Sequence, residues 1–343
     1  MREGVTLQIN LAPTDLPHAR LILPHQLRCW AGQVAEVVLT VDLHRSRNRY
    51  ATGWAERLPG LRDLVVQCCR DHHAVRSCDV DYSAQAQTRV ADTFFGGRPA
   101  PAKDSLGAPF YAYFAGLLQA TTRYVLHMDS DILYGGGSQV WVGEARSLMA
   151  VRPEVLACNP LPGPPTADGS LRSQSLEREP STTVAYRAPH LSTRLFLIDM
   201  DRLRGLAPLE IRRASWRHAL LAGVEGHPRC EPAETALSVA MAARGMLRVD
   251  FLGSAPGMWS LHPPFRSRLF YQGLPDLVDR VERGEIPEAQ RGRHDVDDSM
   301  VDWTSARPGR RRRMLRYARE AVDRLGPDRG NREAGSPLRD GRM

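Results

Sequence analysis

Two carboxylates, Asp129 and Asp131, stand one residue apart directly after a short apolar segment, Tyr124 to Met128. Residues two positions apart in an extended chain point in the same direction, so both side chains leave the end of the predicted strand together. Their oxygens suit a hard divalent cation, Mn²⁺ or Mg²⁺, that keeps open positions for phosphate oxygens. Such a cation would neutralise charge on a departing nucleotide. Asp129-Ser130-Asp131 is therefore the predicted centre of the active site, and a surface turn is the alternative.

The residues before this pair resemble those of bacterial family 2 glycosyltransferases of the GT-A fold. In that family a loop with Asn or Asp and Gly opens a helix, a second Gly lies late in the helix, and Ala-x-x-x-Tyr leads to the carboxylates. The matching residues here are Lys103-Asp104-Ser105-Leu106-Gly107, Gly116, Ala120 and Tyr124. Tyr113-Phe114-Ala115 stands where the family usually has Arg-Asn. The resemblance implies a hexosyltransferase-like enzyme that uses a nucleotide-diphosphate sugar, with UDP as the expected nucleotide and dTDP and GDP as alternatives.

The resemblance continues downstream, where the family has an acidic pair before x-x-Leu-Ser and a later Gly. Leu237-Ser238 and Gly245 keep those positions, so the second acid falls on Glu234 and the first on Ala233. The family's acid deprotonates the acceptor hydroxyl, which implies that Glu234 is the general base of an inverting reaction. Glu231 is a nearby substitute.

Further site residues follow from the same resemblance. His262, in Trp259-Ser260-Leu261-His262-Pro263-Pro264, takes the place of a late histidine on the metal, beside Asp129 and Asp131. Asp42 ends a strand where the family's acid contacts the base or ribose. Lys103 and Asp104 open the next nucleotide-binding loop, and Asp129 completes the nucleotide-binding set.

Alternating and apolar segments predict the elements that must position these residues. We expect strands at Val5–Leu11, Val34–Val41, Leu61–Cys68, Tyr124–Met128 and Leu195–Ile198, and helices at Arg20–Trp30, Phe110–Gln119 and Glu234–Arg244, with Gly245 as a C-terminal cap. Strand, helix and strand in this order predict an α/β fold with a doubly wound, mostly parallel sheet of GT-A type and ligands at the carboxyl ends of the strands. Pro160 to Pro180 is rich in Pro, Gly and Ser and is expected to form a mobile flap near the acceptor site.

Three regions are expected along the chain. Residues 1–265 form the GT-A domain, with a nucleotide-binding half at 1–131 and an acceptor half at 132–265. Residues 266–306 form a C-terminal helical extension. Residues 307–343 form a basic, partly disordered tail, with one amphipathic helix at Met314–Leu325.

Composition limits the setting and the partners. The net charge is +7 with a pI near 9.3, nearly all of the excess is arginine, and Lys103 is the only lysine. No apolar run reaches the ~18 residues of a membrane span, the first residues lack a signal-peptide pattern, and six scattered cysteines favour a reducing cytosol. We expect a cytoplasmic protein whose basic tail, with Arg310–Arg313, is either solvated or in peripheral contact with the inner face of the membrane. No nucleic acid partner is expected, and the acceptor is a glycan, a lipid or a small molecule.

Other classes of protein remain as alternatives. A nucleotidyltransferase acting on a sugar phosphate usually has a Gly-rich basic loop after its first strand, which Leu11–Asp15 is not. A haloacid-dehalogenase-type phosphatase has a downstream lysine, and none follows Asp131. A zinc module made from Cys68, Cys69, His72, His73 and Cys78 lacks the repeated spacing of such sites. A non-catalytic nucleotide-sugar-binding protein would share the same binding residues.

Overall fold

This computed structural model describes residues 2–47, 51–172, 174, 176–180, 183–304 and 306. The chain divides into two compact units, residues 1–306 and residues 307–343. The described residues all belong to the first unit. The expected tail, with Arg310–Arg313 and the helix at Met314–Leu325, lies outside them.

The described strands join into one sheet. Their bounds are β1 (Arg2–Leu11), β2 (Glu36–Val41), β3 (Val75–Asp79), β4 (Thr122–Asp129), β5 (Leu133–Gly135), β6 (Val155–Pro162), β7 (Glu177–Arg178), β8 (Ala185–Ala188), β9 (Leu195–Asp199), β10 (Leu247–Phe251) and β11 (Trp259–Leu261). The strand order is β3-β2-β1-β4-β9-β6-β10-β8-β7. Strands β3, β2, β1 and β4 run parallel, as do β6 and β10, whereas β9 and β8 are antiparallel to their neighbours. Strand β11 joins the short strand β5 to β6.

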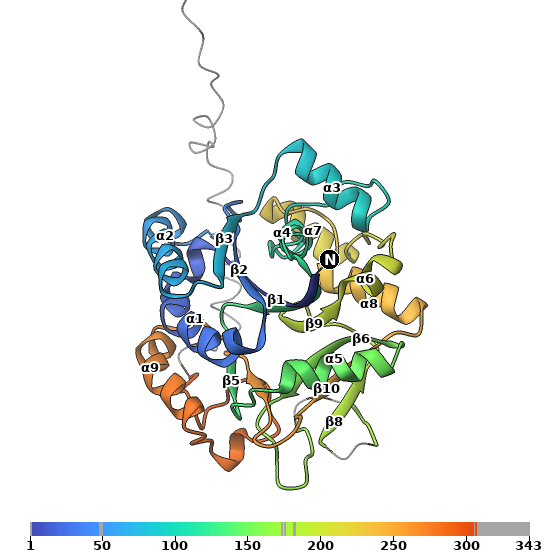
Figure 1. Cartoon of the computed structure of the whole chain (residues 1–343). Helices are drawn as coiled ribbons and strands as arrows, with labels where there is room; N and C mark the ends of the chain where they lie inside the picture. Colours follow the sequence, from blue (N-terminus) through green and yellow to red (C-terminus); the bar gives the residue numbers. More distant parts are fainter. Residues whose placement is uncertain are drawn as a thin grey trace, which may run out of the picture. The chain divides into compact units, whose positions relative to one another are not determined.

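Helices cover both faces of this sheet. Their bounds are α1 (Leu16–Trp30), α2 (Trp54–Asp71), α3 (Ala84–Phe94), α4 (Tyr111–Leu117), α5 (Trp141–Val151), α6 (Met200–Gly205), α7 (Trp216–Glu225), α8 (Ala233–Ala243) and α9 (Arg268–Glu282). Figure 1 shows α1, α2 and α5 on one side of the sheet and α3, α4, α6 and α8 on the other. Two apolar cores match these layers, because successive strand residues alternate between the faces: Leu126 and Met128 belong to the first core and Val125 to the second.

The expected fold class is confirmed, since the sheet is mostly parallel and sandwiched between helices. The expected strands Val5–Leu11, Val34–Val41, Tyr124–Met128 and Leu195–Ile198 are confirmed within two or three residues as β1, β2, β4 and β9. The expected helices are confirmed as α1, α4 and α8, and Gly245 has the left-handed φ of +62° that suits a helix end.

One predicted strand is wrong. Leu61–Cys68 lies inside helix α2, whose buried residues Leu61, Val65 and Cys68 recur at helical spacing while Arg62 and Asp63 are only partly buried or exposed on the other side. The consecutive apolar residues Leu64, Val65 and Val66 made the helical spacing of the buried residues hard to recognise in the sequence. The third strand of the sheet is instead β3, whose residues after Val75 are polar and half-exposed, as on the edge of a sheet.

A third apolar core lies under the C-terminal part of the described chain. Helix α9 packs on α1, and Phe270, Leu274 and Val278 join Trp303 and Leu261 of β11 in this core. Residues 266–306 therefore belong to the same compact unit as the sheet. No helix in the described ranges combines the length and the hydropathy required to cross a membrane.

Candidate active site at the carboxyl ends of the strands

The carboxyl ends of β1 and β4 meet where the strand order reverses, since β2 and β3 follow on one side of β1 and β4 lies on the other. Ligands of open α/β sheets bind in the crevice at such a switch point. The register pairs Asn10 of β1 with Asp129, which ends β4, and Asp131 follows one turn residue later. The sheet therefore brings the predicted carboxylate pair to its switch point.

Helices on both faces hold the turn that carries the pair. The buried Gln26 of α1 donates from Nε2 to the carbonyl oxygens of Asp129 and Ile132, each at 2.9 Å. From α4, the hydroxyl of Tyr113 donates to Asp129 Oδ1 at 3.2 Å. Tyr113 belongs to the segment that departs from the family pattern, and its hydroxyl lies on the carboxylate itself.

Asp131 is held by a cation of the protein. The Arg266 guanidinium donates to Asp131 Oδ2, and the other carboxylate oxygen, Oδ1, is buried without a hydrogen-bond partner among the described residues. Burial alone would raise the pKa of Asp131, but Arg266 and, more weakly, His262, His18 and Arg194 together lower it to about 2. The carboxylate is thus charged at neutral pH, with one oxygen available to a further ligand.

The loop after β1 contributes a third carboxylate. Asp15 Oδ2 accepts a hydrogen bond from the Ala12 N–H at 2.8 Å. Burial, and the charges of Asp131 and Asp129, raise the pKa of Asp15 to about 7 in spite of that bond. His18 Nε2 lies 3.2 Å from Ser130 Oγ, and burial, together with Arg266, lowers the pKa of His18 to about 3. This imidazole is therefore neutral.

His262 lies near the carboxylate pair and is among the groups that lower the pKa of Asp131. Its Nδ1 is 2.8 Å from Asp295 Oδ1 and 3.2 Å from Arg194 Nη1. Across the described ranges, no three His, Cys, Asp or Glu side chains are grouped so as to hold a metal by themselves. The predicted set of Asp129, Asp131 and His262 is therefore near one edge of the sheet but is not gathered as a closed metal site.

The predicted nucleotide-binding residues Asp42 and Lys103 form a buried ion pair. Lys103 Nζ donates to Asp42 Oδ2 at 2.6 Å, and both side chains are less than a tenth exposed. Tyr82 donates from its hydroxyl to the other oxygen, Asp42 Oδ1, at 2.9 Å, and the rings of Tyr82 and His44 are 5.0 Å apart. The chain's one lysine is therefore fixed at the carboxyl end of β2.

Asp104, the neighbour of Lys103, serves its own loop. Its Oδ1 accepts from the backbone N–H groups of Leu106 at 2.8 Å and Ala108 at 2.9 Å. Gly107 is needed in that loop, because it has a φ of +79° and a Cβ there would lie 2.6 Å from the His227 ring. The carboxylate shapes the loop that carries Lys103.

Glu234 lines a cavity of about 410 Å³, which lies across the carboxylate pair from Asp42 and Lys103 in the strand order. It lies in the first turn of α8, and its Oε2 accepts from the Thr193 N–H at 3.2 Å. Other polar residues of the cavity include His190, Arg194, Arg248, Asp250 and Asp295. Glu231 does not line it, and its backbone N–H bonds to the Arg212 carbonyl. Only one of the two candidate bases therefore borders open space here.

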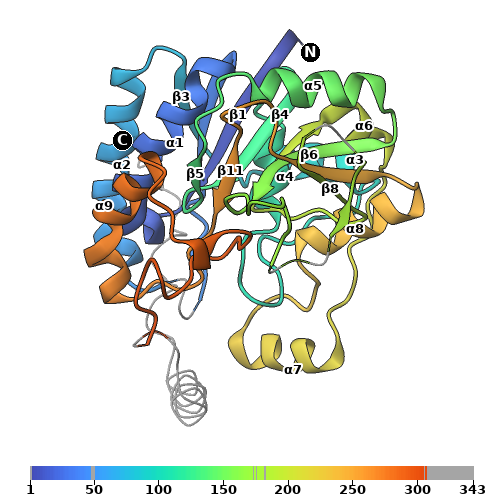
Figure 2. The same cartoon turned by 90° about the horizontal axis from the view of Figure 1, so that it is seen from below.

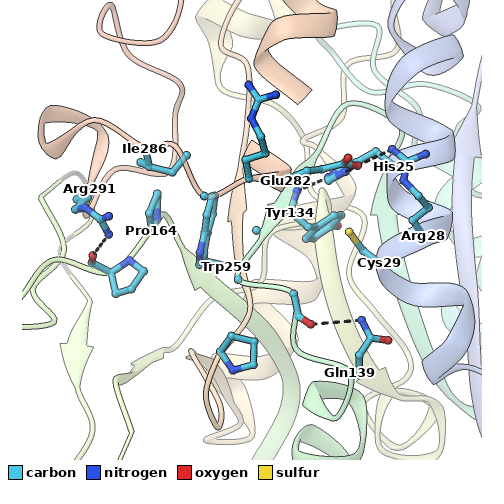
Figure 3. A pocket seen from close by; sticks show the side chains of 17 residues that line it. His25, Arg28, Cys29, Tyr134, Gln139, Pro164, Trp259, Glu282, Ile286 and Arg291 are labelled. Carbon is cyan, nitrogen blue, oxygen red and sulfur yellow. Dashed lines mark hydrogen bonds and ion pairs between the residues drawn. The ribbon is translucent and has the colours of Figure 1, made fainter. Parts of the chain in front are cut away.

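A larger cavity, of about 520 Å³, lies between α1, α9 and the β5–β11 pair and contains none of the predicted site residues (Figure 3). His25 Nε2 accepts from the Tyr134 N–H at 2.9 Å, so its Nδ1 carries the proton and donates to Glu282 Oε1 at 2.7 Å. Arg28 pairs with the same carboxylate. The hydrogen bond from His25 and the ion pair with Arg28 connect Glu282 of α9 to α1. The three side chains therefore have a structural role.

Several residues near the carboxylate pair were not predicted from the sequence. Asp15 has a visible signal, because it follows the end of β1 as Asp131 follows β4, and adjacent parallel strands bring such ends together. Arg266, Arg194 and Asp295 have none, since they lie in loops more than 60 residues downstream of the pair.

Comparisons with known proteins give distant likenesses. No protein-family model and no curated protein matches the chain. Similar solved structures include GalNAc-T7 with UDP, GalNAc and Mn²⁺ (13% identity, TM-score 0.45, covering 76% of this chain and 44% of that one). Two others are the Pyrobaculum calidifontis mannosyltransferase PcManGT with GDP-Man and Mn²⁺ (10%, 0.39, 84% and 66%) and S. aureus TarS 1-349 with UDP-GlcNAc (10%, 0.35, 74% and 57%).

The chain thus spans about half to two thirds of the length of these proteins. With identities of 10–13% and TM-scores of 0.35–0.45, the likenesses carry no argument about the site. Its assignment rests on the geometry of the carboxylates at the switch point.

Proposed function

We propose that this chain is a metal-dependent glycosyltransferase of GT-A type, which moves a sugar from a nucleotide-diphosphate donor to an acceptor hydroxyl with inversion. The observation that carries the proposal is the place of Asp129 and Asp131. They leave the end of β4 at the switch point of a doubly wound sheet, where such folds bind nucleotides. A structural turn would need no second carboxylate with a buried oxygen that accepts no hydrogen bond.

The nucleoside of the donor is proposed to bind along the neighbouring strand ends. Asp42 is the proposed residue for the base or ribose, and Lys103, which is paired with it, is the proposed cation of this part of the site. The rings of Tyr82 and His44 offer aromatic surface beside them. We assign Asp104 an indirect part, since its carboxylate is engaged by the backbone of the loop that positions Lys103.

The carboxylates fit a divalent cation that takes few protein ligands. Asp131 Oδ1 accepts no hydrogen bond from a described residue, and Asp129 is about a quarter exposed. Mg²⁺ and Mn²⁺ sites in nucleotide-dependent enzymes commonly use one or two carboxylates and complete their shell with phosphates and water. His262 stays the proposed third ligand. When bound, the cation neutralises the leaving nucleotide diphosphate.

Glu234 is proposed to take the proton of the acceptor hydroxyl. It lines the 410 Å³ cavity, which also contains Arg194, whose backbone carbonyl accepts from the Asp129 N–H at 2.8 Å. The cavity therefore reaches from the proposed base toward the carboxylate pair. An acceptor bound there would present a hydroxyl between the two.

Calorimetry with nucleotide sugars tests this function. We expect the wild-type chain to bind UDP-sugars in the presence of Mn²⁺ and to lose that affinity in EDTA or in Asp131→Asn. Asp79→Asn is the matched control, because Asp79 also ends a strand of the same sheet but lies on the edge, paired with Arg62 at 2.6 Å. Equal affinity of the wild type and Asp131→Asn, or equal affinity with and without EDTA, would contradict the proposal.

A further inference from the structure

Helix α7 presents large apolar side chains to solvent. Trp216 is 73% exposed, Leu220 63% and Leu221 48%, and Val224 is half exposed. Trp216, Leu220 and Val224 recur every four residues, so they lie along one side of the helix, with Leu221 beside them. An apolar group of this size on one helix is unusual for a surface and marks an interaction site.

The polarity of α7 is the reverse of that of an ordinary surface helix. Its buried residues are the small Ala219 and Ala222, which face the protein. A helix that only covers a core places its large apolar residues inward and its polar residues outward. In α7 the two alanines pack against the rest of the protein, and the large apolar residues face the solvent.

Exposed arginines lie on α7 and in the chain segments next to it. Arg212, Arg213, Arg217 and Arg229 are all exposed, and the Arg217 guanidinium lies 5.3 Å from the centre of the Trp216 ring. The one acid of the helix, Glu225, is half-buried and 3.5 Å from His227. We call the four apolar residues and these four arginines the α7 surface. It combines an apolar helix face with four exposed positive charges.

The α7 surface lies toward the carboxyl ends of the strands. Figure 2 shows α7 standing apart from the other helices, on the side of this unit opposite to the start of β1. The segment after α7 is fixed to the Lys103 loop, because the Ser105 N–H donates to the Cys230 carbonyl at 2.9 Å. Leu106 of that loop is itself 47% exposed.

We propose that the α7 surface docks on an anionic lipid bilayer. Interfacial helices that lie on membranes combine a Trp- and Leu-rich face with arginines on either side, and Trp prefers the boundary between headgroups and acyl chains. A stable protein interface takes roughly 20–30 residues from each partner, far more than one ten-residue helix supplies. The positive charges of the α7 surface favour a negatively charged partner. Its four apolar side chains can enter only a thin apolar layer, and an anionic membrane surface provides both.

Vesicle flotation of the full chain tests this inference, which does not depend on the proposed function. We expect binding to phosphatidylcholine–phosphatidylglycerol vesicles and little binding to phosphatidylcholine alone. Emission of Trp216, the most exposed described tryptophan, should shift to the blue on binding, and Trp216→Phe should lose that shift while still binding. Leu220→Glu and, separately, Leu221→Glu should lower partitioning about tenfold, because each places a charge in the apolar face.

Val151→Glu is the matched control. Val151 is 77% exposed at the end of α5, just before the amino end of β6. The substitution therefore adds the same charge at the amino ends of the strands, away from the α7 surface. It should bind vesicles like the wild type. Absence of binding to anionic vesicles, or equal binding by Leu220→Glu, overturns the inference. A dimer in sedimentation velocity that Leu220→Glu dissociates would assign the α7 surface to a second copy and also overturn it.

Discussion

Glu234 and Glu231 are three residues apart, yet only Glu234 lines the cavity beside the carboxylate pair. If Glu234 takes the acceptor proton, Glu234→Gln keeps the size and polarity of the side chain and removes the base. We expect donor affinity by calorimetry to stay nearly unchanged while turnover falls by roughly two to four orders of magnitude. NMR of the product should show an inverted anomeric configuration, because base and nucleotide lie on opposite faces of the sugar.

Glu231→Gln is the control for this substitution, since it alters the same chain segment without touching the cavity. Its turnover should stay close to that of the wild type. Retention of configuration, or a larger loss in Glu231→Gln than in Glu234→Gln, would remove Glu234 from the role of base.

Asp15 makes the stability of the metal-free protein depend on pH. Its pKa is raised to about 7, so between about pH 4 and pH 7 the native state keeps a proton that the unfolded chain has released. The free energy of unfolding should therefore fall as the pH rises through this window. Because the side chain is 29% exposed, we discount the full shift and expect a loss of about 2 kcal/mol.

Asp15→Asn keeps an acceptor for the Ala12 N–H but cannot ionise. Urea unfolding in EDTA should show the variant about as stable as the wild type near pH 4 and more stable at pH 8. A constant difference between the two proteins from pH 4 to pH 8 would show that Asp15 ionises normally.

The candidate site residues that follow strands could be proposed from the sequence. Asp129, Asp131 and Asp42 could be found because an apolar segment precedes each of them, and Lys103 because of a family pattern. Arg266 and Asp295 could not, because the contacts of Arg266 with Asp131 and of Asp295 with His262 depend on how a distant segment folds back through β11 and α9. The ion pair of Asp42 with Lys103 was also unforeseen, since nothing in a sequence fixes which strand-end side chains meet.

At the scale of elements, the β5–β11 pair depends on a glycine. Gly135 pairs with Trp259, and a Cβ on Gly135 would overlap the Trp259 ring. We expect Gly135→Ala to lower the free energy of unfolding by about 1–3 kcal/mol, the usual effect of overpacking. Gly143→Ala, in α5, is the matched control, because nothing lies within 4 Å of its added methyl. It should be neutral or stabilise by about 0.5–1 kcal/mol in the same denaturation assay.

Pro160–Pro162 belong to β6 and Glu177–Arg178 to β7, so the predicted flap is reduced to the segment between these two strands. Pro160, Pro162 and Leu176 line the cavity with Glu234, and the Gly292 N–H donates to the Pro164 carbonyl at 2.7 Å. Hydrogen exchange in this segment should slow when donor and Mn²⁺ bind together, because closure would protect its amides. Peptides from α2, on the opposite face of the sheet from α8, serve as the internal control. Equal exchange with and without ligands would contradict the flap.

Elements with a regular pattern were predictable, and elements whose pattern is overridden by packing were not. Strands β2 and β4 are buried on both faces, so their residues form apolar runs, whereas β1 alternates apolar and polar residues. Helix α2 shows a similar run at Leu64-Val65-Val66 but exposes Val66 at 46%, which only the tertiary packing decides. In the edge strand β3 only Val75 is buried, so its sequence has no apolar pattern that would predict a strand.

At the scale of the whole described unit, the candidate functional groups lie on the carboxyl side of the sheet. The carboxylate pair, the Asp42–Lys103 ion pair and the α7 surface all lie toward this side, although they come from segments more than 170 residues apart. The amino side, where α5 leads into β6, carries none of the predicted site residues. Such segregation is what a sheet that binds ligands at one edge requires.

Binding at that edge should stabilise the full chain against heat, because a ligand that binds only the native state adds RT ln(1 + [L]/Kd) to the free energy of unfolding. At about 100 times Kd the gain is about 2.7 kcal/mol, which for a unit of this size corresponds to a rise in Tm of about 4 °C. We expect this rise for UDP with Mn²⁺, and smaller rises for GDP or dTDP. Asp79→Asn should shift as the wild type does, and Asp131→Asn should not shift. A rise of equal size in EDTA would mean that the nucleotide binds without the carboxylate pair, and a rise with none of the three nucleotides would remove the donor site from this edge of the sheet.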